Sequence, residues 1–199
     1  MRGMRIIGII LAAGEGRRLG GPKALLRLEG QSFLARTARL LAAGGAERVV
    51  AVLGHQAERV RREAGPLGEL LLVENPRYRE GMLTSILCGL DQAEAFGADA
   101  VLIHPVDHPL VDPATVGRVV AALEGGAVIA VPSCQNRRGH PGGFAAASWQ
   151  ALRAVAADRG ARGVLADHPE WAVHVAGDEG CVTGINTPQD YDRLLHREP

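Results

Sequence analysis

The chain has 199 residues, of which 47% are hydrophobic and 22% charged, so it can form a folded domain with a full core and a cleft. Its 22 basic residues balance its 22 acidic residues, which gives no electrostatic argument for a nucleic-acid or membrane partner. The three cysteines lie far apart and predict neither a disulfide framework nor a C-x-x-C metal site. No apolar run approaches the ~20 residues of a membrane span. We therefore expect a single domain over residues 1–199 in the cytoplasm.

The first stretch with a functional pattern runs from Gly8 to Lys23 and reads GIILAAGEGRRLGGPK. The apolar run Ile6–Leu11 predicts a buried strand. The small residues after it let backbone N–H groups approach phosphate oxygens closely. Arg18 and Lys23 follow and can balance phosphate charge, the arginine as a bidentate fork and the lysine as a point charge. The stretch therefore predicts a phosphate-binding loop.

Other Gly-rich motifs fit this spacing less well. A P-loop needs four residues between two glycines and then Lys-Ser/Thr, an arrangement that does not occur here. A dinucleotide fingerprint would accept Gly14 and Gly16, but Leu19 stands at its third glycine position and Gly20 is one residue late. The remaining alternative is a plain strand-to-helix turn with exposed charges. The paired arginines and Lys23 favour phosphate binding over that turn.

This stretch resembles the signature loop of nucleotidyltransferases, in the form Leu11-Ala12-Ala13-Gly14, three residues, Arg18-Leu19-Gly20, two residues and Lys23. It is most similar to the MobA/MocA-like branch, which attaches CMP or GMP to molybdopterin. The resemblance implies catalytic roles for Arg18 and Lys23. It also implies that the nucleotide is bound by Leu11, Ala12, Ala13, Gly14, Glu15, Gly16, Arg18 and Lys23.

Strands and helices alternate along the rest of the chain, which predicts an α/β fold: a three-layer α/β/α sandwich around a mostly parallel sheet. The resemblance adds that the sandwich is of the Rossmann-like nucleotidyltransferase type. Ser32 is expected to cap the first helix and Thr187 the last. Expected helices cover residues 32–43, 56–63, 84–95, 113–123, 148–156, 160–165 and a C-terminal segment, and expected strands cover 48–53, 70–73, 100–104, 128–131 and 171–175.

The segment from Asn75 to Leu90 contains the hydroxyl pair Thr84-Ser85. Either hydroxyl could cap the helix that follows, which is the common fate of such residues. Ser85 could instead point its hydroxyl at a ligand. The segment resembles its counterpart in the molybdenum-cofactor cytidylyltransferases, which implies that Gly81 and Ser85 lie near the base.

Asp107 lies just past a predicted central strand, in the pattern Pro-x-Asp-x-Pro. Ligands of open α/β sheets bind at that edge. A carboxylate beside a triphosphate needs a cation between them, and Mg²⁺ is suited to carboxylate and phosphate oxygens. The alternative is an ordinary turn residue, but the pattern also resembles the metal-binding aspartate motif of the family, which implies a catalytic as well as a metal-binding role for Asp107. His104 and His108 flank it without zinc-type spacing, so we treat both as positioning or incidental.

The stretch from Asn136 to Phe144 is basic and Gly-rich and is expected to be a loop. A solvated loop is the simplest interpretation. Its Gly-His-Pro core is similar to the cytidylyltransferases, where this region faces the acceptor. The resemblance therefore implies that the acceptor is bound by Arg138, Gly139, His140 and Pro141.

The last motif, Gly184-Ile185-Asn186-Thr187-Pro188, departs from the cytidylyltransferase pattern Asp-Ile-Asp-Thr-Pro. The guanylyltransferase form has Asn at the position of Asn186. We expect Asn186 to share one Mg²⁺ with Asp107, with one negative charge fewer than a pair of aspartates. The departure argues against CTP, whereas Ala13 and the Asn75–Leu90 segment favour it.

We therefore expect a Mg²⁺-dependent enzyme that transfers a nucleoside monophosphate from an NTP, with CTP favoured, to a phosphorylated acceptor of the molybdopterin type. The resemblance adds a molybdoenzyme or its chaperone as a candidate partner. A guanylyltransferase using GTP and a sugar-phosphate nucleotidyltransferase remain alternatives within the class. Outside it remain a nicotinamide-dependent oxidoreductase and a regulatory module that binds nucleotide without catalysis.

Overall fold

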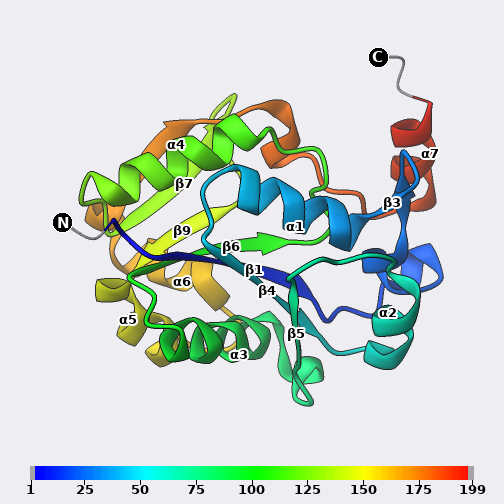
Figure 1. Ribbon diagram of the computed structural model, residues 1–199. Coiled ribbons are helices and arrows are strands. Elements are labelled where there is room, and N and C mark those ends of the chain that lie inside the picture. The colour runs from blue at the N-terminus through cyan, green and yellow to red at the C-terminus, as the bar shows by residue number, and fades with distance from the viewer. Residues whose placement is uncertain (1–2, 197–199) are drawn as a thin grey trace.

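The structure is a computed structural model that describes residues 3–196, so residues 1, 2 and 197–199 of the expected domain lie outside it. One eight-stranded sheet has the order β10-β7-β9-β6-β1-β4-β5, with β8 paired to β7 (Figure 1). Its neighbours are parallel except where β9 or β8 takes part. Its strands are β1 (Ile6–Ala12), β4 (Arg48–Leu53), β5 (Leu71–Glu74), β6 (Ala100–Pro105), β7 (Ile129–Cys134), β8 (Arg137–Arg138), β9 (Gly142–Ala145) and β10 (Ala172–Ala176). The short strands β2 (Arg27–Leu28) and β3 (Gln31–Ser32) form a separate antiparallel pair.

Strand β1 lies between β4 and β6 and is parallel to both. Because parallel strands are covered on both faces, β1 is an almost continuous apolar run. Gly8 is the exception. A Cβ there would come 3.0 Å from Leu41 Cδ1, so the glycine lets a helix pack directly on the strand. The Gly-rich loop therefore begins at the carboxyl edge of the sheet, where this central strand ends.

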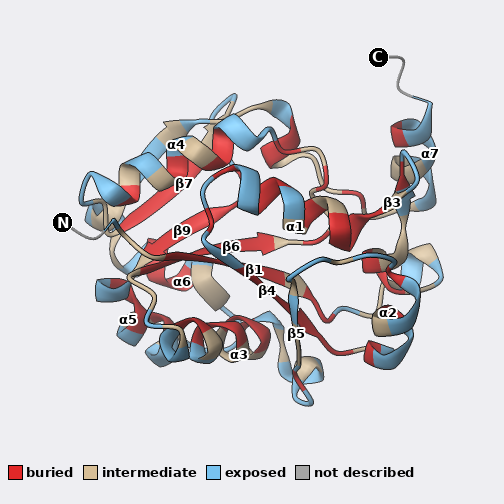
Figure 2. Ribbon diagram, in the orientation of Figure 1, coloured by how far each residue is buried: buried red, intermediate tan, exposed pale blue. Residues whose placement is uncertain are grey.

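Helices cover both faces of the sheet, as Figures 1 and 2 show. On one face, Ile6 and Ile10 belong to the same buried cluster as side chains of α1 and α4, and on the other, Ile7 and Ile9 belong to a cluster with α3, α5 and α6. The three-layer, mostly parallel α/β fold is therefore confirmed. The helices are α1 (Phe33–Ala43), α2 (Ala57–Glu63), α3 (Met82–Ala95), α4 (Pro113–Glu124), α5 (Trp149–Ala154), α6 (Gly160–Asp167) and α7 (Pro188–Leu195). Within residues 3–196, no helix combines the length and apolarity that crossing a bilayer requires.

The helix caps predicted for the first and the last helix are both present. Ser32 Oγ accepts a hydrogen bond from the Ala35 amide at the start of α1, so the predicted cap is confirmed. Thr187 and Asp190 form a reciprocal capping box at the start of α7, which also confirms that prediction. Helix α7 is thereby fixed directly after the Gly184–Asn186 segment.

The predicted cap of α3 is wrong. The helix begins at Met82 with Gly81 as its N-cap residue, and no side chain caps it. Thr84 instead donates to the carbonyl oxygen of Gly81, three residues back. Ser85 is buried in the first turn. The hydroxyl pair therefore lies inside the first turn of the helix, not at its N-cap.

The segment 136–144, expected to be a loop, in part forms the antiparallel strand β9 between β6 and β7. Glycine makes this possible. A Cβ at Gly143 would come 2.7 Å from Val119 Cγ1 and 2.8 Å from Leu123 Cδ1 of α4. The glycines that suggested a flexible loop instead allow a helix to approach the sheet closely.

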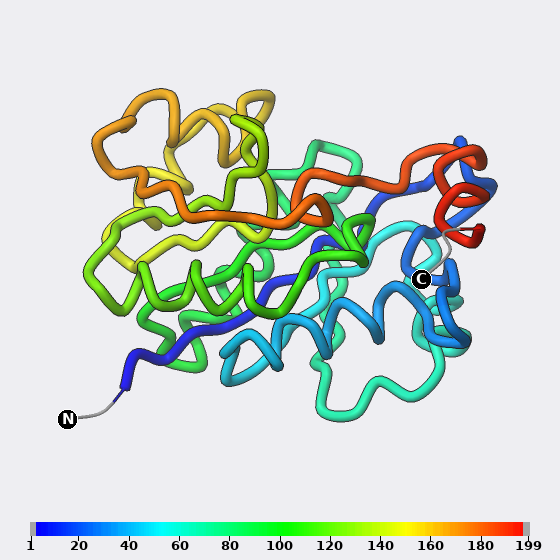
Figure 3. The backbone as a smooth tube through the Cα atoms, turned by 90° about the horizontal axis from the view of Figure 1, so that it is seen from above, coloured from blue at the N-terminus to red at the C-terminus, as the bar shows by residue number. Residues whose placement is uncertain are grey.

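The C-terminal segment returns to the loop region that follows β1. Figure 3 shows the red helix α7 beside the blue segment that follows β1, at one end of the molecule. The Tyr191 hydroxyl donates to the Arg27 carbonyl at 2.7 Å, and the Tyr191 and Phe33 rings meet edge to face. This return brings the Asn186 segment to the edge where β1 and β6 end.

Candidate active site

A cavity of about 260 Å³ opens at the carboxyl ends of β1 and β6, where the fold predicts ligand binding. Three segments far apart in sequence form its walls: the Gly-rich loop, the turn into α3 and the end of β6. Its lining residues are Leu11, Ala12, Ala13, Gly14, Gly16, Lys23, Tyr78, Met82, Ser85, Pro105, Val106 and Asp107. A larger groove of about 720 Å³ lies between α1 and residues 66–70, and it contains none of the predicted site residues.

The Gly-rich loop folds back on itself at Gly16. That residue has φ +60°, and a Cβ there would come 1.9 Å from the Gly21 carbonyl oxygen, so only glycine fits. The Leu19 amide closes the turn by donating to the Gly16 carbonyl at 2.8 Å. Gly14 is exposed, and a Cβ there would meet nothing within 4 Å. The loop thus leaves open space beside Gly14.

The charged residues of this loop differ in their surroundings. Arg17 pairs with Glu15, which also lies 3.8 Å from Arg79. Arg18 is exposed, and none of the hydrogen bonds or ion pairs found within residues 3–196 involves it. Lys23, in contrast, begins a short 3₁₀ turn after Pro22, and its side chain is only 19% exposed.

Lys23 joins the two residues predicted to bind metal. Its Nζ lies 2.6 Å from Asp107 Oδ2 and 2.6 Å from Asn186 Oδ1. The Asp107 side chain is 17% exposed, so this ion pair is shielded from water on most sides. Asp107 and Asn186 therefore point their oxygens at one point in space, as a shared cation site requires.

His108 holds the second oxygen of the Asp107 carboxylate. Its Nδ1 lies 2.9 Å from Asp107 Oδ1, so this nitrogen carries a proton and donates it to the carboxylate. Burial by itself would raise the pKa of Asp107, but the His108 hydrogen bond and the Lys23 charge outweigh burial and hold that pKa well below its usual range. Asp107 is thus a fixed anion with Oδ2 turned toward Lys23.

The Gly184–Pro188 motif lies directly against Asp107 and His108. The Ile185 amide donates to the Asp107 carbonyl at 2.8 Å, and the Asn186 amide donates to the Asp190 carboxylate at 3.1 Å. A Cβ at Gly184 would come 2.9 Å from Asn186 Nδ2 and 3.1 Å from His108 Cε1. A side chain at this position would therefore require Asn186 or His108 to shift.

Three histidine rings cluster beside Asp107. The ring centroids of His108 and His140 are 4.8 Å apart, and His104 lies 6.2 and 6.4 Å from them. Burial lowers the pKa of His104 to about 3 and that of His140 to about 4, so both rings are neutral near pH 7. Within the described chain, His104 Nδ1 has no hydrogen-bond partner. The sequence did not predict this cluster, although Pro-x-Asp-x-Pro and Gly-His-Pro each contain a histidine.

The residues predicted to bind the acceptor are less open than expected. A Cβ at Gly139 would come 2.5 Å from Cys181 Sγ, and the His140 amide donates to the Cys181 carbonyl at 2.8 Å. Pro141 is buried, whereas Arg138 is exposed. The description of this stretch as a solvated loop is therefore wrong at Gly139 and Pro141. Of the four predicted residues, Arg138 is exposed and His140 lies beside His108.

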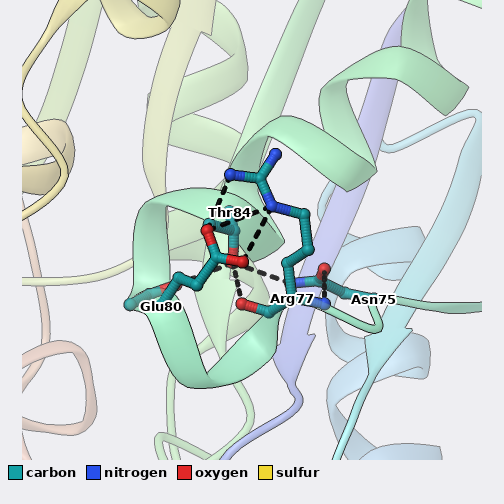
Figure 4. Close-up of polar contacts among 5 residues, drawn as sticks. Asn75, Arg77, Glu80 and Thr84 are labelled. Atoms are coloured by element: carbon teal, nitrogen blue, oxygen red, sulfur yellow. Dashed lines mark hydrogen bonds and ion pairs between the residues drawn. The ribbon is translucent and has the colours of Figure 1, made fainter.

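The turn into α3 forms the opposite wall of the cavity. Asn75 Nδ2 donates to Thr84 Oγ1 at 2.9 Å and to Ser85 Oγ at 3.0 Å, which fixes both hydroxyls. Figure 4 shows Arg77 and Glu80 paired over the same turn, where Thr84 Oγ1 also lies 3.0 Å from the Arg77 carbonyl oxygen. Gly81 has φ +124°, a conformation that disfavours any other residue.

Four lining residues were not predicted as site residues from the sequence: Tyr78, Met82, Pro105 and Val106. Tyr78 packs on the end of β4, where a Cβ at Gly54 would come 2.7 Å from its Cγ. The Met82 side chain is 63% exposed, although it is large and apolar. The scarcity of aromatic residues in this chain is a signal that could have identified Tyr78.

Comparison with known proteins identifies the family of this chain and several relatives. Residues 8–172 match the MobA-like NTP transferase domain. A nicotine blue oxidoreductase from Paenarthrobacter nicotinovorans is 35% identical, with 96% of each chain covered. Two proteins from Cereibacter sphaeroides, a 2-C-methyl-D-erythritol 4-phosphate cytidylyltransferase and a molybdenum cofactor guanylyltransferase, are each 36% identical over 96% of this chain and 95% of their own.

The fold also has close counterparts among solved structures. The crystal structure of Rv0371c from Mycobacterium tuberculosis H37Rv superposes with a TM-score of 0.83 at 26% identity, covering 98% of this chain and 100% of that one. The domain match covers most of the sequence, including the Gly-rich loop, Asp107 and the three histidines. The chain therefore belongs to the MobA-like NTP transferase family of nucleotidyltransferases.

Proposed function

We propose that the chain transfers a nucleoside monophosphate from an NTP to a phosphorylated acceptor and releases pyrophosphate. The convergence of Lys23, Asp107 and Asn186 beside the open Gly-rich loop is the observation that carries this proposal. A phosphate oxygen of the acceptor attacks the α-phosphorus. A new P–O bond forms there as the bond to the bridging oxygen of pyrophosphate breaks. The protein supplies no nucleophile, so its contribution is positioning and charge.

The donor atoms at the site fit Mg²⁺. Asp107 Oδ2 and Asn186 Oδ1 are hard oxygen ligands that point at a common position, and Mg²⁺ usually takes one or two carboxylates together with phosphates and water. Bound there, the ion would neutralise phosphate charge. Asp107 and Asn186 would hold it, and His108 would keep the Asp107 carboxylate in place.

The remaining roles follow from position. Lys23 and Arg18 are placed to bind the triphosphate and to balance the charge that grows on pyrophosphate. The backbone from Leu11 to Gly16 is placed for the nucleotide, and Gly81 and Ser85 for its base. Arg138 and His140 are candidates for the acceptor, with Gly139 and Pro141 shaping their backbone.

The proposed substrates are CTP and an acceptor of the molybdopterin type. Ala13 and the Asn75–Leu90 segment support CTP. Relatives named as a cytidylyltransferase and as a guanylyltransferase are equally identical to this chain, so overall identity favours neither base. A pyrophosphate-release assay with each of the four NTPs, Mg²⁺ and molybdopterin tests the proposal. Metal-dependent release with one NTP supports it, and no release with any NTP contradicts it.

A second candidate is an oxidoreductase that uses a nicotinamide nucleotide. The 35% identity to the protein named nicotine blue oxidoreductase favours it, because that likeness covers 96% of both chains. Against it stand Leu19 in the broken dinucleotide fingerprint and the absence of an acid at the end of β4, where Leu53-Gly54-His55 stands. Following NADH absorbance with nicotine blue as the acceptor distinguishes the two candidates.

A further inference from the structure

We propose that Lys23 occupies the cation position of this site while nucleotide is absent, and gives it up to the metal when the NTP phosphates bind the lysine instead. This inference rests on the proposed function and adds an order of binding to it. Metal would enter with the nucleotide and would not bind the free protein first. The first support is geometric, because the Lys23 ammonium contacts the same two oxygens that would bind the ion.

The two occupants exclude each other. Mg²⁺ binds oxygen at about 2.0–2.1 Å, and the ammonium already contacts both oxygens at 2.6 Å. An ion held by Asp107 Oδ2 and Asn186 Oδ1 would therefore overlap the ammonium group. It would also be repelled by the lysine charge at a site that is largely shielded from water. The lysine must move before metal can bind.

The local charge balance keeps the lysine in place without nucleotide. Lys23 and Asp107 cancel, Asn186 is neutral, and His108 donates a hydrogen bond to the other oxygen of Asp107. The next carboxylate in the motif, Asp190, is occupied by the amides of Asn186 and Thr187. The Lys23–Asp107 pair thus has no net charge and both carboxylate oxygens have partners, which removes the attraction that two aspartates would exert on a free divalent ion.

Nucleotide offers Lys23 an alternative within reach. Lys23 lines the same cavity as Gly14 and Gly16, where the backbone is placed for phosphates. A lysine side chain has four flexible methylene groups, so its ammonium can turn from the carboxylate to phosphate oxygens without moving the backbone. Phosphates would then add negative charge beside Asp107 and create the metal site that the free protein lacks.

The test uses Mn²⁺ as a paramagnetic probe, with free and bound ion counted by electron paramagnetic resonance. Wild type, Lys23→Met and Arg17→Met are titrated with Mn²⁺ alone. Lys23→Met should bind Mn²⁺ about tenfold or more tightly than wild type, because removing the ammonium frees both oxygens. Arg17→Met, a control that removes the same charge from the same loop but does not contact Asp107, should match wild type.

The titrations are repeated with the α,β-methylene analogues of CTP and GTP, which cannot be cleaved at the α-phosphorus. The order of affinities should now reverse, with Lys23→Met binding the Mn²⁺-nucleotide complex about tenfold or more weakly, since a phosphate contact is lost. Lys23→Gln serves as a second variant, and circular dichroism confirms that each variant is folded. Tighter binding of Mn²⁺ alone but weaker binding of the Mn²⁺-nucleotide complex is the result expected if Lys23 blocks the metal position in the free protein and binds phosphate in the complex.

Two results would overturn the inference. One is wild type binding Mn²⁺ alone as tightly as it does with nucleotide. The other is folded Lys23→Met or Lys23→Gln showing no gain in affinity for Mn²⁺ alone. Failure of wild type to bind either analogue would contradict the proposed function instead, because the titrations with metal alone would still report on Lys23.

Discussion

Asn186 Oδ1 lies 2.6 Å from Lys23 Nζ, although 163 residues separate them along the chain. The contact joins the end of the Gly-rich loop to the segment before the last helix, next to the aspartate that follows β6. The group formed by Lys23, Asp107 and Asn186 therefore contains one negative charge, on Asp107. This arrangement makes the phosphates of a nucleotide the natural source of the further charge that a divalent ion needs.

Lys23→Ala should lower NTP turnover and leave the protein folded. Losing one charge-assisted contact in the transition state should cost about 2–4 kcal/mol, by analogy with the loss of an oxyanion-hole donor. Pyrophosphate release and thermal unfolding of both proteins measure the two effects. A folded Lys23→Ala variant with wild-type turnover would rule out this role for the lysine.

Gly184→Ala should weaken metal-dependent nucleotide binding. The added methyl group would come 2.9 Å from Asn186 Nδ2 and 3.1 Å from His108 Cε1, so one of these side chains must shift. Gly117→Ala in α4 is a matched control, because its Cβ would meet only the Gly44 carbonyl oxygen at 3.9 Å. Calorimetric titration with an NTP analogue and Mg²⁺ compares them. Equal affinities for the two variants would show that the fit around Gly184 is unimportant.

Stability should fall as pH decreases from about 6.5, where an exposed histidine gains its proton. Burial lowers the pKa of folded His104 to about 3, so below pH 6.5 the unfolded chain binds a proton that the folded chain does not. His104 therefore contributes a loss of about 1–2 kcal/mol in unfolding free energy between pH 7 and 5. Urea unfolding at several pH values measures the slope.

His104→Gln should make the unfolding free energy depend less steeply on pH, whatever its effect on stability at pH 7. The exposed His174 provides the control, because His174→Gln should leave the slope unchanged. His140, whose pKa burial lowers to about 4, should retain its own share of the slope in both variants. The explanation would fail if the two variants showed the same dependence on pH.

CTP should bind more tightly than GTP. Ala13 and the segment that carries Ser85 motivate this expectation, and Asn186 argues against it. The hydroxyls of Thr84 and Ser85 are held by Asn75, so the wall near the base is a fixed set of polar groups. Calorimetric titration of each NTP with Mg²⁺ decides between them, and tighter binding of GTP would show that the guanylyltransferase pattern at Asn186 is the better guide.

The sequence predicted the sheet, the two capping residues and the convergence of Asp107 with Asn186, because these depend on local pattern and on the edge where parallel strands end. It did not predict β9, since glycines that allow α4 to approach the sheet look like loop residues until the helix is in place. The predicted cap at Thr84 or Ser85 was wrong, because Gly81, with φ +124°, is the N-cap residue and α3 begins directly after it.

The histidine cluster and the Lys23 bridge could not be predicted from spacing. His104 and His108 come from the end of β6, whereas His140 precedes β9, and only the antiparallel insertion of β9 brings them together. Likewise, Lys23 contacts Asp107 and Asn186, which lie far from it in the sequence, so spacing within the loop does not reveal these contacts. Both features depend on tertiary packing and on the charge balance within the site.

Pyrophosphate release by wild type, Asp107→Asn and Asn186→Asp, measured with the preferred NTP and molybdopterin across a Mg²⁺ titration, tests the central claim most directly. Wild-type release should require Mg²⁺. Asp107→Asn should nearly abolish release, because the site then provides no negative charge to hold the ion. Asn186→Asp should reach half-maximal rate at lower Mg²⁺. Release without added metal, or wild-type rates from folded Asp107→Asn, would contradict the assignment of this site.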